Sequence, residues 1–226
     1  MDTKHGIRLE NVSKHFRKGS DVVRALDGIA LEVPGGALAT VRGPSGSGKT
    51  TLINLVAGLM RPTSGAVFVA GERLDGLSPA QRAALRARRI AVVFQMFHLV
   101  PYLTTIENVL LPTLAAPAAP GENLAERAQS MIAALGIEHR TGHFPDELSV
   151  GERQRCAVAR ALLHRPEVVL ADEPTGNLDP DSARRVLEAL DTCRAEGATV
   201  LLVTHHPVDS IHPDIEFRLE NGVLSG

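Results

Sequence analysis

The sequence has little cysteine and no excess of either charge. Its 226 residues include only two cysteines, Cys156 and Cys193, whose spacing matches neither a metal-ligand pattern nor a redox pair. We therefore expect both thiols to be buried and reduced, as in a cytosolic protein. The 24 basic and 26 acidic side chains leave a formal net charge of −2, which gives the chain no overall attraction to nucleic acid or to an anionic lipid surface.

The sequence also lacks long hydrophobic runs. The N-terminus, MDTKHGIRLE, has no apolar core of the kind found in signal peptides. The central uncharged stretch IAVVFQMFHLVPYLTTI is interrupted by Gln95, His98 and Pro101. It is shorter than the roughly 20 apolar residues that a membrane-spanning helix needs. We therefore expect no segment of this sequence to cross a bilayer.

Arginines gather in two places, at positions 82, 86, 88 and 89 and at positions 153, 155 and 160. Both groups fall in segments with helical patterning. Charge runs of this kind are more typical of solvated helix faces than of nucleic-acid patches. We therefore expect no nucleic-acid partner.

Apolar runs alternate with helical segments along most of the chain. Several runs are continuously apolar, as is typical of strands that are covered on both faces. One helix is expected to begin after Ser78, with Gln81 completing a capping box, and another to begin at Asp179 and end at Gly197. This alternation predicts an α/β domain with a mainly parallel sheet; the runs span residues 7–12, 37–43, 66–71, 90–95, 168–173, 199–205 and 216–222.

Residues 96–165 have a different character. Strand-like runs are few, helix starts are several, and Thr104 with Glu107 forms a further capping box. We expect one domain over residues 1–226. In it, a helical subdomain at about 96–165 is inserted into an α/β core formed by about 1–95 and 166–226.

The segment GPSGSGKT at residues 43–50 has the spacing of a P-loop, and it lies between an apolar run and a helical segment, as that motif requires. The glycines let the backbone curl so that its N–H groups point at phosphates. Lys49 is expected to reach the β- and γ-phosphates, and the Thr50 hydroxyl to ligate Mg²⁺. The predicted nucleotide-binding residues of the loop are Gly43, Pro44, Ser45, Gly46, Ser47, Gly48, Lys49, Thr50 and Thr51.

The run VVLADE at residues 168–173 predicts the second half of such a site. Asp172, at the carboxyl end of a buried strand, is expected to hold Mg²⁺ through water, and Glu173 to polarise the attacking water. Taken alone, an acidic pair at a strand end is equally consistent with capping of the next loop. His205 ends the run VLLVTH and is expected to contact the γ-phosphate.

Five motifs occur in a characteristic order: GPSGSGKT, VVFQ, LSVGERQR, VVLADEPTGNLD and VTHH. Together they resemble the nucleotide-binding subunit of an ATP-binding-cassette (ABC) transporter, over about residues 7–224. The resemblance implies a P-loop NTPase core with a small antiparallel β subdomain at the N-terminus, and an ATPase that uses ATP and Mg²⁺. It further implies that Phe16 stacks on adenine, that Gln95 contacts Mg²⁺ or the attacking water, and that Asp179 reaches an opposite monomer.

The resemblance also gives a trans-acting role to the segment that we call the signature segment, residues 149–152. Ser149, Val150, Gly151 and Glu152 are expected to close over the γ-phosphate bound by a second copy of the chain. The alternative is that Ser149 only caps its own helix. The family usually has glycine at Val150, and a branched side chain there adds bulk and restricts the backbone.

Within the family, the motifs resemble most the branch that serves lipoprotein release, macrolide-type efflux and related peptide or lipid export. The expected partners are a second copy and membrane-spanning permease subunits, which hold the chain peripherally at the cytoplasmic face of the membrane. Residues 96–102 carry no formal charge and are the expected permease contact, although a self-contained helical core would also explain them. Two further functions remain open: a regulatory ATPase that signals without moving cargo, and a soluble P-loop phosphotransferase.

Overall fold

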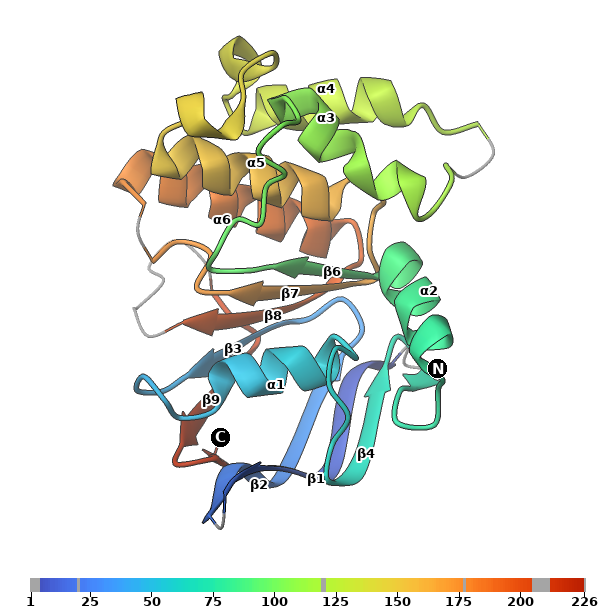
Figure 1. The fold of residues 1–226 in the computed structure, drawn as a ribbon, viewed down its shortest axis with the longest axis vertical. Coiled ribbons are helices and arrows are strands. Elements are labelled where there is room, and N and C mark those ends of the chain that lie inside the picture. Colours follow the sequence, from blue (N-terminus) through green and yellow to red (C-terminus); the bar gives the residue numbers. More distant parts are fainter. Residues whose placement is uncertain (1–4, 20, 119–120, 177, 205–211, 226) are drawn as a thin grey trace.

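The fold contains two β-sheets, one across the middle of the molecule and one at its lower end (Figure 1). The computed structural model describes the whole chain except residues 1–4, 20, 119–120, 177, 205–211 and 226. One sheet is antiparallel, with the order β2-β1-β4-β5, and the other has the order β10-β9-β3-β8-β7-β6. The first comprises β1 (His5–Lys18), β2 (Asp21–Pro34), β4 (Ser64–Val69) and β5 (Glu72–Arg73). The second comprises β3 (Leu38–Arg42), β6 (Ile90–Val93), β7 (Val168–Asp172), β8 (Thr199–Thr204), β9 (Ile215–Glu220) and β10 (Val223–Ser225).

The larger sheet is parallel apart from its last pair. Strands β6, β7, β8, β3 and β9 pair in parallel register, and β10 pairs with β9 in antiparallel register. Every residue of β7 and β8 is buried, because helices or a second sheet cover both faces. Successive residues of β7 alternate between two cores: Val168 and Leu170 join one, and Val169 and Ala171 join the other. The predicted α/β class is confirmed.

Helices divide between the two faces of this sheet (Figure 1). Helix α1 (Lys49–Val56) packs on one face together with the antiparallel sheet, and α2 (Pro79–Arg89) lies beside it. The opposite face carries α3 (Thr105–Leu110), α4 (Leu124–Ala134), α5 (Val150–Leu162) and α6 (Pro180–Ala195). Short 3₁₀ turns occupy Leu111–Leu114, Glu138–Arg140 and Pro145–Glu147. One continuous core therefore joins the helices of region 96–165 to α6 and the sheet.

The helix starts predicted from the sequence are confirmed. Complete capping boxes begin α2, α3 and α5, with Ser78, Thr104 and Ser149 as the N-cap residues. Asp179 caps α6 by accepting a hydrogen bond from the Ser182 backbone N–H at 3.0 Å. Each cap satisfies backbone N–H groups that have no partner inside the helix.

Three strands have no counterpart among the predicted runs: β2, β5 and β10. Strand β2 carries Asp21, Arg24 and Asp27 and is exposed over its first half, so its sequence shows no continuous apolar run. Its partner β1 decides its conformation, through a long antiparallel register that runs from His5↔Pro34 to Lys18↔Asp21. Strand β10 has only three residues, too few for a periodic pattern.

The expectation that the clustered arginines form solvated helix faces is wrong for four of them, of which Arg89 donates to the carbonyl oxygen of Ala70 and binds Glu167. Arg82 and Arg86 both donate to the carbonyl oxygen of Gly58, at 3.1 Å each. Arg160 donates to the carbonyl oxygens of Phe97 and His98. Their guanidinium groups bind backbone acceptors of neighbouring segments, which the charge pattern of the sequence does not reveal.

Both cysteines are free and buried, as expected. Burial raises the pKa of the Cys156 thiol to about 12 and that of Cys193 to about 11, so both stay protonated at neutral pH. In the part of the chain that the structure describes, no helix is both long enough and apolar enough to span a membrane.

Leu170 lies at the middle of β7 with no exposed surface. We expect Leu170→Ala to lower the free energy of unfolding by about 2–5 kcal/mol, because the lost burial adds to the cost of a cavity. Urea unfolding measures the change, with Val223→Ala in the exposed edge strand β10 as the control. Equal losses in the two variants would contradict this account of the core.

Candidate functional site

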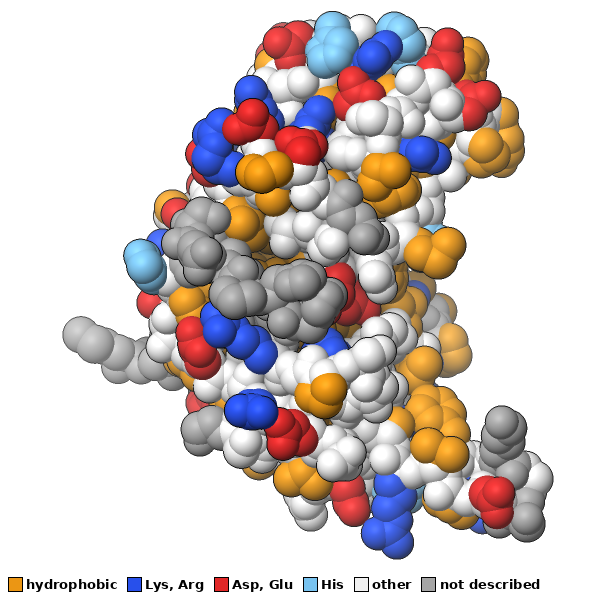
Figure 2. Space-filling view, turned by 90° about the vertical axis from the view of Figure 1, so that its left-hand side faces the viewer, with side chains coloured by type: hydrophobic (Ala, Val, Ile, Leu, Met, Phe, Trp, Pro, Cys, Tyr) orange, Lys and Arg blue, Asp and Glu red, His pale blue; other side chains and the backbone are white. Residues whose placement is uncertain are grey.

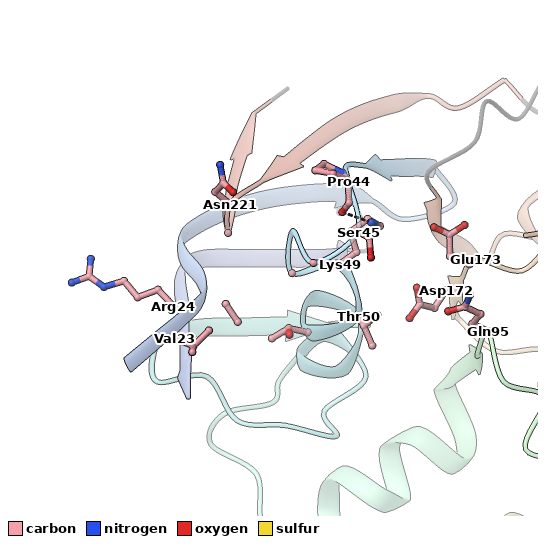
Figure 3. A pocket seen from close by; sticks show the side chains of 15 residues that line it. Val23, Arg24, Pro44, Ser45, Lys49, Thr50, Gln95, Asp172, Glu173 and Asn221 are labelled. Atoms are coloured by element: carbon pink, nitrogen blue, oxygen red, sulfur yellow. Dashed lines mark hydrogen bonds between the residues drawn. The ribbon is translucent and has the colours of Figure 1, made fainter. Parts of the chain in front are cut away.

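An open cleft of about 780 Å³ lies where the parallel strands end (Figure 3). The loop after β3, the end of β7, the residue Gln95 after β6, strand β2 and the β9–β10 turn line it. Carboxyl ends of adjacent parallel strands meet at one edge of a sheet, which is where α/β proteins bind ligands. The volume falls within the range of small-molecule sites, which is about 300–1,000 Å³.

The loop between β3 and α1 has the geometry of an anion cradle. Gly46 and Gly48 have φ values of 80° and 109°, in the left-handed region that favours glycine, and Gly48 is the N-cap of α1. The Lys49 ammonium donates to the carbonyl oxygens of Gly43 and Pro44, at 2.8 Å each, so it lies inside the curve of the loop. Free N–H groups at the start of α1 and this ammonium group both attract phosphate.

Gly43 is required for a reason other than the one expected. Its φ is not in the left-handed region, but a Cβ at Gly43 would lie 2.0 Å from the carbonyl oxygen of Leu219 in β9. The close approach of two backbones therefore excludes any side chain. Ser47 is buried, and its carbonyl oxygen accepts a hydrogen bond from the Gly222 N–H at 3.1 Å, which ties the loop to the β9–β10 turn.

Asp172 ends β7 and is buried opposite the start of α1. Burial raises the pKa of Asp172, and the neighbouring Glu173 carboxylate raises it further. A hydrogen bond from the Thr50 side chain and the positive charge of Lys49 act in the opposite direction. The carboxyl group thus faces the P-loop residues expected to bind phosphate and metal (Figure 3).

Glu173 adopts a backbone conformation that a residue with a side chain rarely takes, with φ at 49°. Its N–H donates to the carbonyl oxygen of Val203 in β8 at 2.9 Å, which fixes the turn. Such a conformation costs about 1–3 kcal/mol and persists where the surrounding structure holds it in place. The side chain is nearly buried and points into the cleft beside Asp172 (Figure 3).

Gln95 lies on the same side of the cleft as the two carboxyl groups, and Val23, Arg24 and Asn221 lie at the opposite end (Figure 3). Phe16 is the cross-strand partner of Val23 and is 38% exposed. Paired residues share one face of a sheet, so Phe16 lies beside Val23, although it is not among the residues that line the cleft. Its stacking role stays a prediction, and His205 lies outside the described residues.

The signature segment lies at the exposed start of α5. The Ser149 hydroxyl accepts from the Glu152 N–H at 3.2 Å, and Glu152 accepts from the Ser149 N–H at 2.7 Å. Val150 is 42% exposed. A Cβ at Gly151 would lie 2.8 Å from the Ser182 hydroxyl of α6, so the start of α6 at Asp179 packs directly against it.

Sequence reasoning missed the side chains that support this helix start. Arg140 Nε donates to Glu152 at 2.8 Å, His139 Nε2 lies 3.3 Å from the same oxygen, and Arg155 donates to Ser182. Burial alone would raise the pKa of Glu152, but hydrogen bonds from Ser149 and Arg140 outweigh it and lower the pKa to about 2. The 3₁₀ turn that carries His139 and Arg140 has no motif that could have identified it.

Figure 2 shows the face onto which the cleft opens. Acidic and basic side chains are interspersed over its upper part, which the helices form, and acidic and basic groups also lie near the cleft. Among the described residues of this face, neither sign of charge forms a continuous patch.

The site combines a glycine-rich loop at a helix start with two carboxyl groups that face it across the cleft. This combination defines a P-loop nucleotide-binding protein. Comparison of the chain with known protein families narrows this class. A family model described as ABC transporter matches residues 26–176. The chain belongs to the ABC transporter family. It is an ATP-binding subunit of that family and an ATPase.

The relatives cover nearly the whole chain. Lipoprotein-releasing system ATP-binding protein LolD of Xanthomonas axonopodis pv. citri is 46% identical over 88% of this chain and 82% of its own length. The LolD protein of Paramagnetospirillum magneticum is 38% identical over 97% of both. The dimeric post-hydrolysis state of the ATP-binding cassette MJ0796 with ADP and Pi matches at a TM-score of 0.90 and 33% identity, covering 97% of both chains.

The low pKa of Glu152 predicts a pH dependence of stability. A carboxyl group with a pKa of about 2 in the folded chain and an ordinary 4.5 in the unfolded chain stabilises the fold above pH 4.5. That contribution, about 3 kcal/mol at most, is lost as the pH falls toward 2. Glu152→Gln keeps an acceptor for the capping box and removes the charge.

We therefore expect the difference in unfolding free energy between the wild type and Glu152→Gln to shrink between pH 5.5 and pH 3. Urea unfolding at both pH values measures it. Glu138→Gln, at an exposed position of the neighbouring turn, should show no such trend. A difference that is independent of pH would contradict the assignment.

Proposed function

We propose that two copies of this chain bind head to tail around two ATP molecules and drive conformational change in membrane-spanning permease subunits. One observation carries the proposal. The cleft collects the P-loop, Asp172, Glu173 and Gln95 from one chain, whereas Ser149 stands exposed at the start of α5. A second copy placing its α5 start over the cleft would complete the site with a helix N-terminus, which attracts anions.

Within this site we assign roles to the individual side chains. Lys49 and the P-loop N–H groups bind the β- and γ-phosphates. Phe16 stacks on adenine beside Val23, and His205 orients the γ-phosphate. The neighbouring copy supplies Ser149 and the N–H groups behind it, and the loop that ends at Asp179 meets the opposite monomer. Glu173 polarises the attacking water.

The residues present fit Mg²⁺. Asp172, Thr50 and Gln95 offer oxygen donors, which Mg²⁺ prefers. Mg²⁺ keeps several waters and binds through one or two carboxylates and substrate phosphates, so the Asp172 carboxyl group with the Thr50 side chain beside it suits this ion. When bound, the ion would neutralise charge on the phosphates.

The permease contact is proposed at residues 96–102. Met96 and Tyr102 are 72% and 78% exposed, which argues against burial of this segment in a self-contained core and favours a docking surface. We further propose that the subunit associates peripherally with the cytoplasmic face of the membrane. The cargo is proposed to be lipoprotein, by analogy with the LolD relatives.

A division of the chain accompanies this proposal. Residues 1–95 and 166–226 form the nucleotide-binding core, and residues 96–165 carry the signature segment. The two parts share one hydrophobic cluster that includes Val109 of α3, Leu162 of α5 and Leu202 of β8, so motion in one is expected to reach the other.

Glu173→Gln tests the proposed catalytic role. The change keeps the shape of the side chain and removes its charge. We expect ATP hydrolysis to fall by roughly 10²–10⁴-fold, while ATP binding persists because the P-loop is unchanged. A phosphate-release assay and nucleotide titration measure the two properties. Retained turnover would assign the role to another residue.

The same variant tests the dimer. With ATP and Mg²⁺ at saturation, Glu173→Gln should sediment as a dimer, because bound nucleotide that is not hydrolysed keeps the two halves together. The control is the same protein without nucleotide. A monomer under saturating ATP and Mg²⁺, with the permease present, would refute the composite site.

Val150→Gly tests the departure in the signature segment. Val150 is exposed at the first turn of α5, where glycine would remove bulk from the proposed interface. We expect the ATPase rate to stay unchanged or to rise. A clear fall in the ATPase rate would show that this protein needs valine at position 150 for full activity.

A further inference from the structure

Two arginines of α5 hold the segment that follows Gln95. Arg160 donates through one guanidinium nitrogen to the carbonyl oxygen of Phe97 and through the other to that of His98, at 2.7 Å each. Arg153 lies over the Phe97 ring, 5.8 Å from its centroid. Residues 97 and 98 belong to no helix or strand, so these side-chain contacts decide where the segment lies.

These contacts hold His98 in an unfavourable backbone conformation. His98 has a φ of 46°, which a residue with a Cβ seldom adopts. Its ring meets that of Phe94 edge to face, with the centroids 5.2 Å apart. A planar guanidinium group that binds two successive carbonyl groups selects one geometry, because both hydrogen bonds must be satisfied at once.

The far end of the segment is held by α3. Buried Asn108 accepts from the Val100 N–H at 2.8 Å and donates to the carbonyl oxygens of Val100, Leu103 and Thr104. The segment is thus fixed at both ends to the helices, and Met96 and Tyr102 project from it.

Helix α5 connects these arginine contacts with residues 97 and 98 to the signature segment. Ser149, Arg153 and Arg160 are spaced by four and seven residues, which places them on one side of a helix. They span eleven residues, or roughly 16 Å along the axis. The helix that begins at the signature segment therefore carries, on the same side, both arginines that hold the residues after Gln95.

We propose that Arg160, aided by Arg153, is a positioning residue that fixes residues 96–98 to α5, so that Gln95 and the signature segment move as one body. This inference rests on the proposed function. A partner that contacts Met96 or Tyr102 would therefore move two parts of the site together. One is Gln95 in the cleft, and the other is the signature segment at the start of α5.

The test compares ATP hydrolysis and amide hydrogen exchange of the purified subunit with those of Arg160→Met. We expect kcat to fall about tenfold or more, because Gln95 loses its placement, while KM for ATP stays within about twofold, because the P-loop is untouched. Amide exchange in residues 96–100 should become about tenfold faster. Arg160→Lys, whose shorter side chain and compact ammonium group lack the planar fork that matches two carbonyl groups, should fall between the two.

Arg127→Met is the matched control. Arg127 also donates to two backbone carbonyl oxygens, those of Leu162 and Leu163, at the C-terminal end of α5 and away from residues 96–98. It should lose a comparable interaction without changing kcat or the exchange of residues 96–100. If Arg160→Met does not fold, as judged by urea unfolding, Arg160→Lys carries the same comparison.

The outcomes separate the two proposals. Faster exchange with unchanged kcat would leave Arg160 a purely structural role and overturn the inference, as would unchanged exchange. Equal losses in Arg127→Met would overturn it as well. A wild-type chain that does not hydrolyse ATP would instead refute the proposed function.

Discussion

The parallel pairing of β3, β8 and β7 creates the cleft and fixes which residues line it. Strand β8 pairs with β3 on one side and with β7 on the other, in a register that aligns Arg42 with Thr204 and Asp172 with Val203. The P-loop after β3 and the carboxyl groups at the end of β7 therefore face one cleft. Because the pairing is parallel, both segments leave the sheet at the same edge.

Several local features around the cleft are unfavourable alone and are maintained by their surroundings. Glu173 has a left-handed backbone that its hydrogen bond to Val203 holds in place. Gly43 lies so close to Leu219 that no side chain fits between the backbones. The buried Asp172 carboxyl has a raised pKa. Features of this kind gather at functional sites, where the surrounding structure offsets their cost.

Helix α5 brings together interactions that are distant in the sequence. Its start is capped by Ser149 and braced by Arg140 through Glu152, and its side contacts the start of α6 through Gly151 and Ser182. Its last turns bind the backbone of residues 97 and 98. A shift of this helix would therefore move several parts of the proposed composite site together, because rigid elements transmit displacement along their length.

Features that depend only on neighbouring residues can be predicted from the amino-acid sequence alone. The P-loop, the capping boxes at Ser78, Thr104 and Ser149, and the buried strand that ends at Asp172 were all predictable, because hydrogen bonding to the next turn and apolar runs are local properties. The resemblance to the family added the roles of Gln95 and the signature segment, which remain proposals.

The remaining features join residues that are far apart in the chain, so they become visible only in the folded molecule. Strand β2 becomes a strand through pairing with β1, although charged residues interrupt its apolar pattern. Arg160 looks like a surface charge in the sequence, and it is the fold that places two carbonyl groups some sixty residues away within its reach. The groups that a long side chain binds depend on which segments the fold brings near it, and the neighbouring sequence does not reveal those segments.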